Sequence, residues 1–298
     1  MMAASKQPVL RGELRLNESL RRYNTWRVGG PARQLYLPAD IDDLVQFMLT
    51  LPADEPLLWL GLGSNLLIRD GGFPGTVICL QSRLSGLYIN DDQVHVEAGV
   101  SCAKVARQCA RAHLTGAAFL AGIPGTMGGA LAMNAGAFGG ETWPIVSSVI
   151  TIDRAGTVRR RLPGDFQVAY RKVVRPGEEW FLACTLDLVQ GDSAAEQAAI
   201  RALLERRAAT QPTGQPSCGS TFRNPPGDHA ARLIEVSGLK GYRIGGAEVS
   251  TKHANFIINT GEASAADIEK LIAHVAHAVE RQQGVSLQTE VHMTGEPL

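Results

Sequence analysis

Two glycine-rich segments are the part of this sequence best suited to hold a phosphorylated ligand. The first reads Gly-Leu-Gly-Ser-Asn over residues 61–65, and the second occupies residues 121–141. Backbone N–H groups in such loops can surround phosphate oxygens without any lysine. The second segment runs into a stretch able to form a helix, whose N-terminus would favour an anion. Each loop alone is equally compatible with a tight turn, but together they predict a site for a dinucleotide or another large cofactor.

A serine in the segment 218–227 is a candidate proton donor. Ser220 follows a glycine in a loop bounded by prolines. It does not belong to a nucleophile elbow, because Phe222 stands where that motif needs its second glycine. A serine hydroxyl is a very weak acid, so proton transfer requires an adjacent charge or a hydrogen-bond relay. The alternative is a serine that only stabilises a turn.

Two charged residues are suited to an anionic substrate. The guanidinium fork of Arg171 fits a carboxylate or a diphosphate. Lys172 and Arg175 follow it closely, so a solvated basic patch is the alternative. Glu290 lies on the polar side of a predicted strand, where most carboxylates are only solvated. The seven histidines have neither HxH nor HExxH spacing, so we predict no metal site.

Alternating strands and helices must position these residues. Asp40 is the predicted N-cap of a helix over residues 41–48, where apolar residues recur at helical spacing. Two apolar runs flank residues 61–65 and predict a strand on each side. Residues 94–100 alternate as a strand does, and Ser101 is the predicted cap of the helix that follows.

The middle of the chain is richer in strands and ends in a long helix. Ser193 and Glu196 form a predicted capping box at the start of that helix. The helix is expected to end near Pro212, where we place a domain boundary. Strands are predicted over residues 146–153, 157–162 and 180–189.

Residues 208–298 are predicted to form a compact α+β unit. A strand pair is expected within residues 245–261, followed by a helix that Ser264 and Asp267 cap. Residues 284–293 alternate as a closing strand. Glu290 would point away from its apolar face, because successive strand side chains lie on opposite sides.

The bulk properties limit the function further. The chain has 298 residues, enough for two or three domains. Its 29 Lys and Arg balance 29 Asp and Glu, which argues against a general nucleic-acid or membrane-surface binder. No apolar run approaches the roughly 20 residues of a membrane span, and residues 1–10 lack a signal-peptide core. Leu66 stands where a Rossmann fingerprint needs its third glycine, so we predict no doubly wound domain.

The cysteines point to a reducing compartment. Their number is five and no CxxC pair occurs, so we predict reduced, mostly buried thiols in a cytoplasmic protein.

With these segments in order, the chain resembles the UDP-N-acetylenolpyruvoylglucosamine reductase family, flavoenzymes of bacterial cell-wall precursor synthesis. The likeness covers essentially the whole length, and the length itself is similar to the shorter form of the family, without a tyrosine-bearing loop over the substrate. The matching segments are residues 23–32, 60–70, 121–141, 170–171, 216–225 and 238–259, with Glu290 in the closing strand.

The resemblance implies an α+β fold with a two-part FAD-binding domain of the vanillyl-alcohol-oxidase (PCMH) type. Residues 1–80 and 81–207 would form its two subdomains, and residues 208–298 an α+β substrate-binding domain. FAD is then the cofactor and NADPH the reductant. The expected FAD contacts are Gly61, Gly63, Ser64, Asn65, Gly122, Ile123, Pro124, Gly125, Thr126, Gly128, Asn134, Ala135 and Gly136.

The resemblance also implies the reaction. NADPH reduces FAD, and flavin N5 then delivers hydride to the enolpyruvyl group of UDP-N-acetylglucosamine enolpyruvate, giving UDP-N-acetylmuramate. Ser220 would donate the proton, and Arg171 would stabilise the substrate carboxylate. Glu290 would complete the site in its protonated form or through hydrogen bonds. Tyr170, Arg207 and Asn224 are the expected substrate contacts, and no nucleic-acid, membrane or obligate protein partner is expected.

Two positions depart from the family pattern. Val173 stands where a serine is frequent, and His292 where an arginine is frequent. Because His292 shares the polar side of its strand with Glu290, we hypothesise an unusual pH dependence. Two other functions stay open: a different FAD oxidoreductase with this cofactor fold, and a non-catalytic protein that binds a nucleotide sugar or phosphate.

Overall fold

The structure, a computed structural model, describes residues 9–298. The N-terminal part is a sheet in which β2 has an antiparallel neighbour on one side and a parallel neighbour on the other. The crossover from β2 to β3 contains α1 (Ile41–Met48), and Asp40 accepts a hydrogen bond from the Asp43 N–H (2.9 Å), as predicted. The sheet order is β1 (Glu13–Ser19), β2 (Pro31–Leu37), β5 (Phe73–Cys79) and β3 (Leu57–Leu60).

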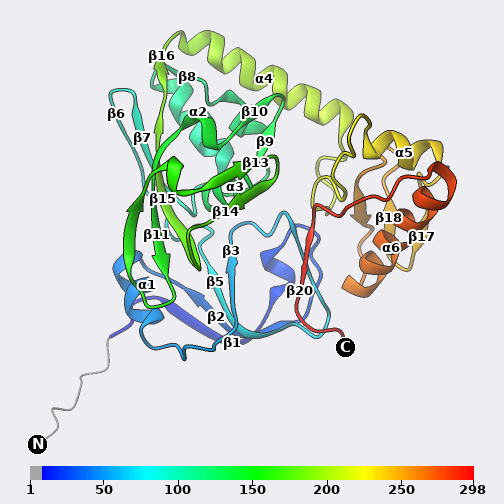
Figure 1. The fold of residues 1–298 in the computed structure, drawn as a ribbon, viewed down its shortest axis with the longest axis horizontal. Coiled ribbons are helices and arrows are strands. Elements are labelled where there is room, and N and C mark those ends of the chain that lie inside the picture. Colours follow the sequence, from blue (N-terminus) through cyan, green and yellow to red (C-terminus); the bar gives the residue numbers. More distant parts are fainter. Residues whose placement is uncertain (1–8) are drawn as a thin grey trace, which may run out of the picture.

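The second part is a five-stranded antiparallel sheet covered by helices (Figure 1). Ser101 caps α2 (Cys102–Arg111) by accepting from the Lys104 N–H, as predicted. α3 (Met127–Met133) packs against β15, and α4 (Ser193–Thr210) runs along the outside toward the C-terminal part. The sheet order is β12 (Val158–Arg161), β11 (Val146–Asp153), β15 (Glu179–Asp187), β7 (Gln93–Glu97) and β6 (Leu87–Asn90).

The start of α4 differs from the prediction. Asp192 is the N-cap, and its carboxylate accepts from the Ala194 N–H (2.8 Å). Glu196 instead accepts from the N–H groups of Gly116 (3.2 Å) and Ala118 (3.0 Å). The predicted Ser193 capping box is therefore wrong, because the Glu196 carboxylate satisfies the backbone of a distant loop.

The C-terminal part is a three-stranded sheet packed against two helices, α5 (Ala230–Val236) and α6 (Ala265–Gln283). At the start of α6, Ser264 accepts from the Asp267 N–H and the Asp267 carboxylate accepts from the Ser264 N–H, which confirms the predicted capping box. The predicted strand pair is also confirmed. The pair consists of β18 (Ala247–Val249) and β19 (Ile257–Asn259), and β17 (Arg243–Ile244) adds a third strand beside β18.

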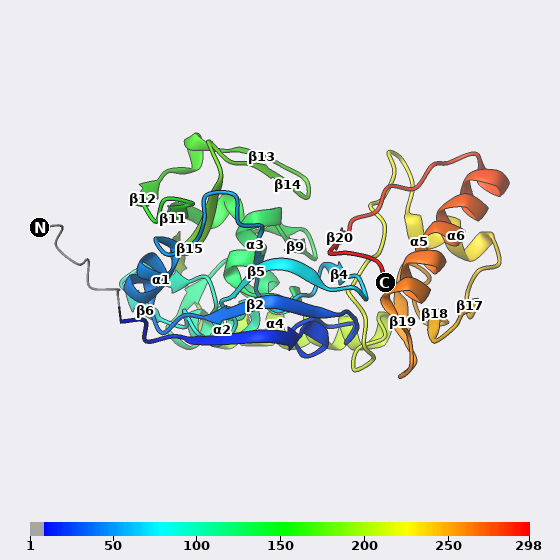
Figure 2. The same cartoon turned by 90° about the horizontal axis from the view of Figure 1, so that it is seen from below.

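The predicted closing strand is much shorter than expected. Only β20 (His292–Thr294) is a strand, and it pairs in parallel with β4 (Leu66–Ile68) of the N-terminal part. Before it, Thr289 makes an isolated antiparallel bridge to Phe222. The closing segment therefore connects the C-terminal part to the first glycine loop instead of completing a C-terminal sheet (Figure 2).

The hairpin of β13 (Gln167–Ala169) and β14 (Lys172–Val174) extends from the second part toward β20 (Figure 2). All five cysteines are buried and free, as predicted. Every helix within residues 9–298 is too short or too polar to cross a membrane. The boundaries at residues 80 and 207 stay predictions. The remaining strands are β8 (Leu114–Thr115), β9 (Gly136–Ala137), β10 (Gly140–Glu141) and β16 (Val189–Gln190).

Candidate active site

Arg171 lies at the tip of the hairpin β13–β14. The pairing of Ala169 with Lys172 leaves only Tyr170 and Arg171 in the turn, and Arg171 has a φ of 54°. This left-handed conformation favours glycine and costs another residue about 1 to 2 kcal/mol. The Arg171 Nη2 group donates to the Gly136 carbonyl (3.2 Å), which fixes the guanidinium against the second glycine segment.

Glu290 forms an ion pair with Arg171, with 2.9 Å between Arg171 Nε and Glu290 Oε1. The two side chains are only 20% and 10% exposed. The Nε hydrogen is not aimed at the carboxylate, so the contact lacks hydrogen-bond geometry and the donor remains free. Burial raises the pKa of Glu290 above its ordinary value, while the charges of Arg171 and Arg223 oppose that shift.

The backbone around Glu290 is held by two other segments. The Glu290 N–H donates to the Thr221 carbonyl (2.8 Å). Asn65 Nδ2 donates to the Glu290 carbonyl (3.1 Å), and the Asn65 carbonyl accepts from the His292 N–H (3.0 Å). The Asn65 side chain, predicted to contact FAD, thus also positions the segment that carries Glu290.

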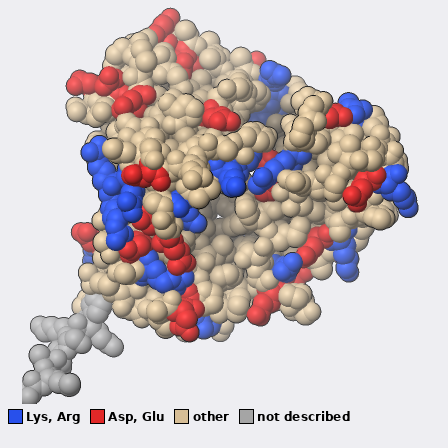
Figure 3. All heavy atoms as spheres, viewed as in Figure 1, with Lys and Arg blue, Asp and Glu red and all other residues tan. Residues whose placement is uncertain are grey.

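Ser220 lies half-buried immediately before Thr221. The Thr221 carbonyl accepts a hydrogen bond from the Glu290 N–H. Ser220 is therefore the neighbour in sequence of a residue that is bonded to the Arg171–Glu290 pair. Residues from three distant stretches of the chain therefore meet at one place. Figure 3 shows a hollow between the N-terminal and C-terminal parts, with Lys and Arg atoms along its rim.

The first glycine loop presents unused backbone donors. Within the described chain, the N–H groups of Leu62, Gly63 and Ser64 donate to no other protein group. Gly63 has a φ of 64°, and a Cβ there would collide with the Tyr23 carbonyl, so only glycine fits. Such a run of free amides is suited to phosphate oxygens.

At the start of α3, where we predicted an anion site, two backbone amides are occupied by the protein itself. The helix is present, but the Met127 N–H donates to the Val100 carbonyl (2.8 Å) and the Gly128 N–H to the Ala98 carbonyl (2.9 Å). These two amides are not available to an anion, but the Gly129 N–H donates to no group among the described residues, so the anion site stays a prediction. A Cβ on Gly128 would meet the Ala98 Cβ at 2.9 Å, so this glycine serves the packing of α3.

The two glycine segments approach each other at one point. A Cβ on Gly61 would collide with Thr126 Oγ1, and this hydroxyl is buried without a hydrogen-bond partner among the described residues. A buried donor without a partner is costly and indicates a missing ligand. The free amides of residues 62–64 and the Thr126 hydroxyl therefore fit the pyrophosphate of a dinucleotide such as FAD.

The end of the second segment has a structural role. Asn134 ends α3 in the left-handed conformation, its Nδ2 donates to Glu141 Oε2 (2.8 Å) and its Oδ1 accepts from the Trp143 N–H (3.1 Å). A Cβ on Gly122 would meet the Phe138 ring at 2.7 Å. These side chains hold the loop, and the predicted FAD contacts of Gly122, Ile123, Gly125, Asn134, Ala135 and Gly136 stay predictions.

A pocket of about 520 Å³ lies between the glycine segments and the start of the C-terminal part. Ser64, Pro124, Arg207 and Gly219 contribute to its lining, so it joins residues predicted for FAD and for substrate. Arg207 Nε donates to Gln211 Oε1 (3.2 Å), and burial lowers the pKa of this arginine. An anion in this pocket would offset the cost of that burial.

The two other predicted substrate residues lie on different elements. Tyr170 is exposed beside Arg171, whose guanidinium lies 5.6 Å from the ring centre. Asn224 Oδ1 accepts from the Ala230 N–H (3.1 Å) at the start of α5. The Asn224 carbonyl oxygen therefore has a structural role, and its NH₂ group remains for a ligand.

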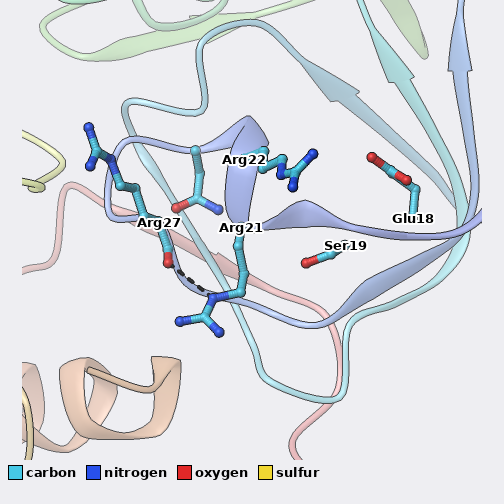
Figure 4. A pocket seen from close by; sticks show the side chains of 6 residues that line it. Glu18, Ser19, Arg21, Arg22 and Arg27 are labelled. Carbon is cyan, nitrogen blue, oxygen red and sulfur yellow. Dashed lines mark hydrogen bonds between the residues drawn. The ribbon is translucent and has the colours of Figure 1, made fainter. Parts of the chain in front are cut away.

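Sequence reasoning missed an open, arginine-lined pocket of about 760 Å³ around Arg21, Arg22 and Arg27. Arg21 Nε donates to the Arg27 carbonyl (3.3 Å). Figure 4 shows the three guanidinium groups pointing in different directions, so one anion cannot contact them all. Within residues 9–298 no group of three or more His, Cys, Asp or Glu is arranged to hold a metal ion.

Comparison with known proteins assigns the two halves of this architecture. The profile of the family described as "FAD binding domain" matches residues 32–161. The profile described as "UDP-N-acetylenolpyruvoylglucosamine reductase, C-terminal domain" matches residues 211–294. FAD is therefore the cofactor, in agreement with the free amides of the first glycine loop.

Relatives match over nearly the full length. UDP-N-acetylenolpyruvoylglucosamine reductase of Alkalilimnicola ehrlichii is 60% identical over 296 residues, which are 99% of each chain. The enzyme of Methylococcus capsulatus is 58% identical and covers 96% of this chain and 94% of its own.

A solved structure shows the same fold. The crystal structure of UDP-N-acetylenolpyruvylglucosamine reductase from Thermus caldophilus has a TM-score of 0.79 and 34% identity, and covers 95% of this chain and 98% of that chain. The expected α+β class, an FAD-binding domain joined to a C-terminal α+β domain, is confirmed. The chain therefore belongs to the UDP-N-acetylenolpyruvoylglucosamine reductase family and is a flavin-dependent oxidoreductase.

Proposed function

We propose that this protein reduces the enolpyruvyl group of UDP-N-acetylglucosamine enolpyruvate to give UDP-N-acetylmuramate, a precursor of peptidoglycan, with NADPH as the reductant. The observation that carries the proposal is the buried contact between Arg171 and Glu290. The backbone of Glu290 is bonded to the residue after Ser220 and to Asn65 of the first glycine loop. The proposal includes a cytoplasmic location, residues 208–298 as the substrate domain, and the absence of nucleic-acid, membrane or obligate protein partners.

Bound FAD supplies the hydride that adds to the alkene. The carbon next to the substrate carboxylate then becomes electron-rich, and the Ser220 hydroxyl donates its proton there. Arg171 stabilises the negative charge that spreads onto the carboxylate, because its charge is fixed in place and nearly removed from water. The strained turn and the bond to Gly136 hold that guanidinium before substrate arrives.

Glu290 acts in its neutral form in this proposal. An ionised carboxylate would repel the developing negative charge, whereas a protonated one donates a hydrogen bond to it. The raised pKa that burial gives Glu290 supports this protonation state. A neutral Glu290 also leaves the full positive charge of Arg171 for the substrate.

Three further residues are proposed to bind the sugar nucleotide. Tyr170 is exposed beside Arg171, and Asn224 retains a free NH₂ group. Arg207 lines the pocket that adjoins the FAD loops, where a phosphate would compensate its burial. These contacts would place the nucleotide on the C-terminal side and its enolpyruvyl end toward Ser220.

The function is tested by following the flavin through both halves of the reaction. The purified protein should show visible flavin absorbance that NADPH bleaches without oxygen and that the enolpyruvyl sugar nucleotide restores. Bleaching without restoration by this substrate would favour another FAD oxidoreductase. A colourless protein that cannot be reconstituted with FAD would exclude the enzyme and leave a non-catalytic binding protein.

A further inference from the structure

Two short segments run antiparallel beside Glu290. The Arg223 N–H donates to the Gln288 carbonyl (2.9 Å), and the Glu290 N–H donates to the Thr221 carbonyl (2.8 Å). This register places Thr221 opposite Glu290 and Arg223 opposite Gln288. Opposite residues, and residues two places along, share a face of such a pair, so Thr221, Arg223 and Glu290 lie on one face.

This face carries polar groups that have no partner among the described residues. Thr221 is fully buried, and its hydroxyl makes no hydrogen bond. The Nε groups of Arg223 and Arg171 are also buried without a hydrogen-bond acceptor. Three unused donors around one carboxyl group indicate a ligand that accepts hydrogen bonds from all of them.

The charges define the ligand further. Arg171 and Arg223 both lie close enough to act on Glu290, and burial together with Arg223 lowers the pKa of His292, which leaves that imidazole neutral. The cluster is then positive by one charge when Glu290 is ionised, and by two when it is neutral. A buried positive excess requires an anion, and the anionic group that the proposed reaction places beside Arg171 and Glu290 is the substrate carboxylate.

We propose that Arg223 and Thr221 form, with Arg171, the pocket that holds the carboxylate of the enolpyruvyl group. The proposal rests on the proposed function. Arg171 and Glu290 flank the reacting group in that function, and Thr221 and Arg223 share the face of Glu290, so the carboxylate falls beside them. Two arginines on one carboxylate would fix the rotation of the enol ether and reject ligands that lack the acid group.

The test compares two ligands that differ in the enolpyruvyl group. UDP-N-acetylglucosamine enolpyruvate and UDP-N-acetylglucosamine are titrated by calorimetry into the oxidised, FAD-loaded enzyme. Arg223→Gln should weaken binding of the first roughly 10- to 100-fold, as expected for a lost hydrogen bond between charged groups, and leave the second nearly unchanged. Arg223→Lys should recover part of the loss, and the exposed Arg232→Gln serves as the matched control.

A second variant keeps the test independent of folding defects. Thr221→Val removes only the hydroxyl and should weaken the enolpyruvyl ligand several-fold, again without effect on UDP-N-acetylglucosamine. If Arg223→Gln loses its flavin, the test rests on Arg223→Lys and Thr221→Val. For these variants the loss of affinity for the enolpyruvyl ligand is compared with the loss for UDP-N-acetylglucosamine. Equal weakening of both ligands, or no weakening, would overturn the pocket. If the flavin of these variants is still reoxidised by the enolpyruvyl substrate, such a result would exclude the pocket but not the proposed function.

Discussion

Ser220 and Glu290 have different roles in the proposed proton transfer. Ser220 is a weak acid that donates the proton, and Glu290 is a nearly buried carboxyl group. The serine hydroxyl can donate a proton only if a neighbouring charge or hydrogen-bond partner increases its acidity. In the proposed mechanism that group is Glu290, whose N–H donates to the carbonyl of the residue after Ser220 and whose carboxyl group is nearly buried beside Arg171. Their roles can be separated by mutation. Ser220→Ala should slow only the reoxidation of the flavin by substrate, and Glu290→Gln should change the pH dependence of that step.

Ser220→Ala should slow only the second half-reaction. Without the hydroxyl, flavin reoxidation by the enolpyruvyl substrate is expected to fall about 10²- to 10⁴-fold, the usual contribution of a positioned acid. Flavin reduction by NADPH should stay nearly intact, because Ser220 donates no proton in that step. Stopped-flow absorbance measures both rates, and an equal loss in both would mean that Ser220 has a structural role.

The rate of substrate-driven reoxidation should fall as pH rises through the raised pKa of Glu290. The charged groups that act on Glu290 are Arg171 from the hairpin and Arg223 from the neighbouring segment, and His292 in β20 lies close enough to Arg223 to be affected by its charge. Glu290→Gln should remove this limb of the pH profile. His292→Arg adds a permanent positive charge and should move the limb to lower pH, whereas an unchanged profile would show that His292 does not act on Glu290.

The same shift has a consequence for stability. Glu290 keeps its proton to a higher pH in the folded protein than in the unfolded chain, where its pKa is near 4.5. Its contribution to the free energy of unfolding therefore decreases as pH rises from the unfolded pKa to the folded one. Thermal unfolding across this range should show Glu290→Gln gaining stability relative to the parent protein.

At the scale of elements, the two glycine segments act as one unit because they touch at Gly61 and Thr126. Gly61→Ala would push its Cβ into the Thr126 hydroxyl and separate the loops. We expect at least tenfold weaker FAD binding, measured from the flavin retained after gel filtration. Gly164→Ala is the matched control, since a Cβ there meets nothing within 4 Å. Equal flavin retention in both variants would contradict the assignment of this contact to cofactor binding.

Features encoded by adjacent residues were predictable, and those made by distant residues were not. The capping box at Ser264 and the N-cap at Asp40 follow from residues three apart. Glu196 has the spacing of a capping box, but it binds the backbone near Gly116, which no local pattern indicates. Similarly, hydrophobic alternation predicted one strand through Glu290, whereas only His292–Thr294 form a strand, paired with the distant β4, and Thr289 makes a single bridge to Phe222.

The functional residues divide in the same way. Arg171, Ser220 and Glu290 were identified through the resemblance, and the structure brings their segments together. Thr221 and Arg223 gave no signal, because an unused buried donor is visible only after the surrounding elements are in place. If the pairing of this segment with residues 288–290 had been known, Thr221 and Arg223 would have been placed on the same face as Glu290.

At the scale of the whole molecule, the proposed site depends on how the C-terminal part is fixed to the N-terminal part. Trp26 from the N-terminal part is buried in the C-terminal core, and its Nε1 group donates to the Ile257 carbonyl (2.8 Å). Strand β20 pairs with β4, directly after the first glycine loop. Arg69 forms a two-bonded ion pair with Glu269 of α6 (2.7 and 2.9 Å). These contacts align Glu290 with Arg171 across the junction.

Asp70 makes a further contact of this kind, and it supports a prediction about the coupling of the two parts. Its carboxylate oxygens accept hydrogen bonds from the N–H groups of Ala265 and Ala266, both at 2.9 Å, at the start of α6. A carboxylate at a helix N-terminus satisfies unpaired amides and favours the helix dipole.

Asp70→Ala should therefore lower the opening free energy of the first turn of α6 by about 1 to 2 kcal/mol, comparable to the loss of an N-cap. That change corresponds to roughly 5- to 30-fold faster hydrogen exchange of the peptides that contain Ala265 and Ala266, measured by mass spectrometry. Peptides of α4 should exchange at the parental rate, and Asp54→Ala, on an exposed turn, is the control. Unchanged exchange in α6 would show that Ser264 alone holds the helix start and that Asp70 does not couple the two parts.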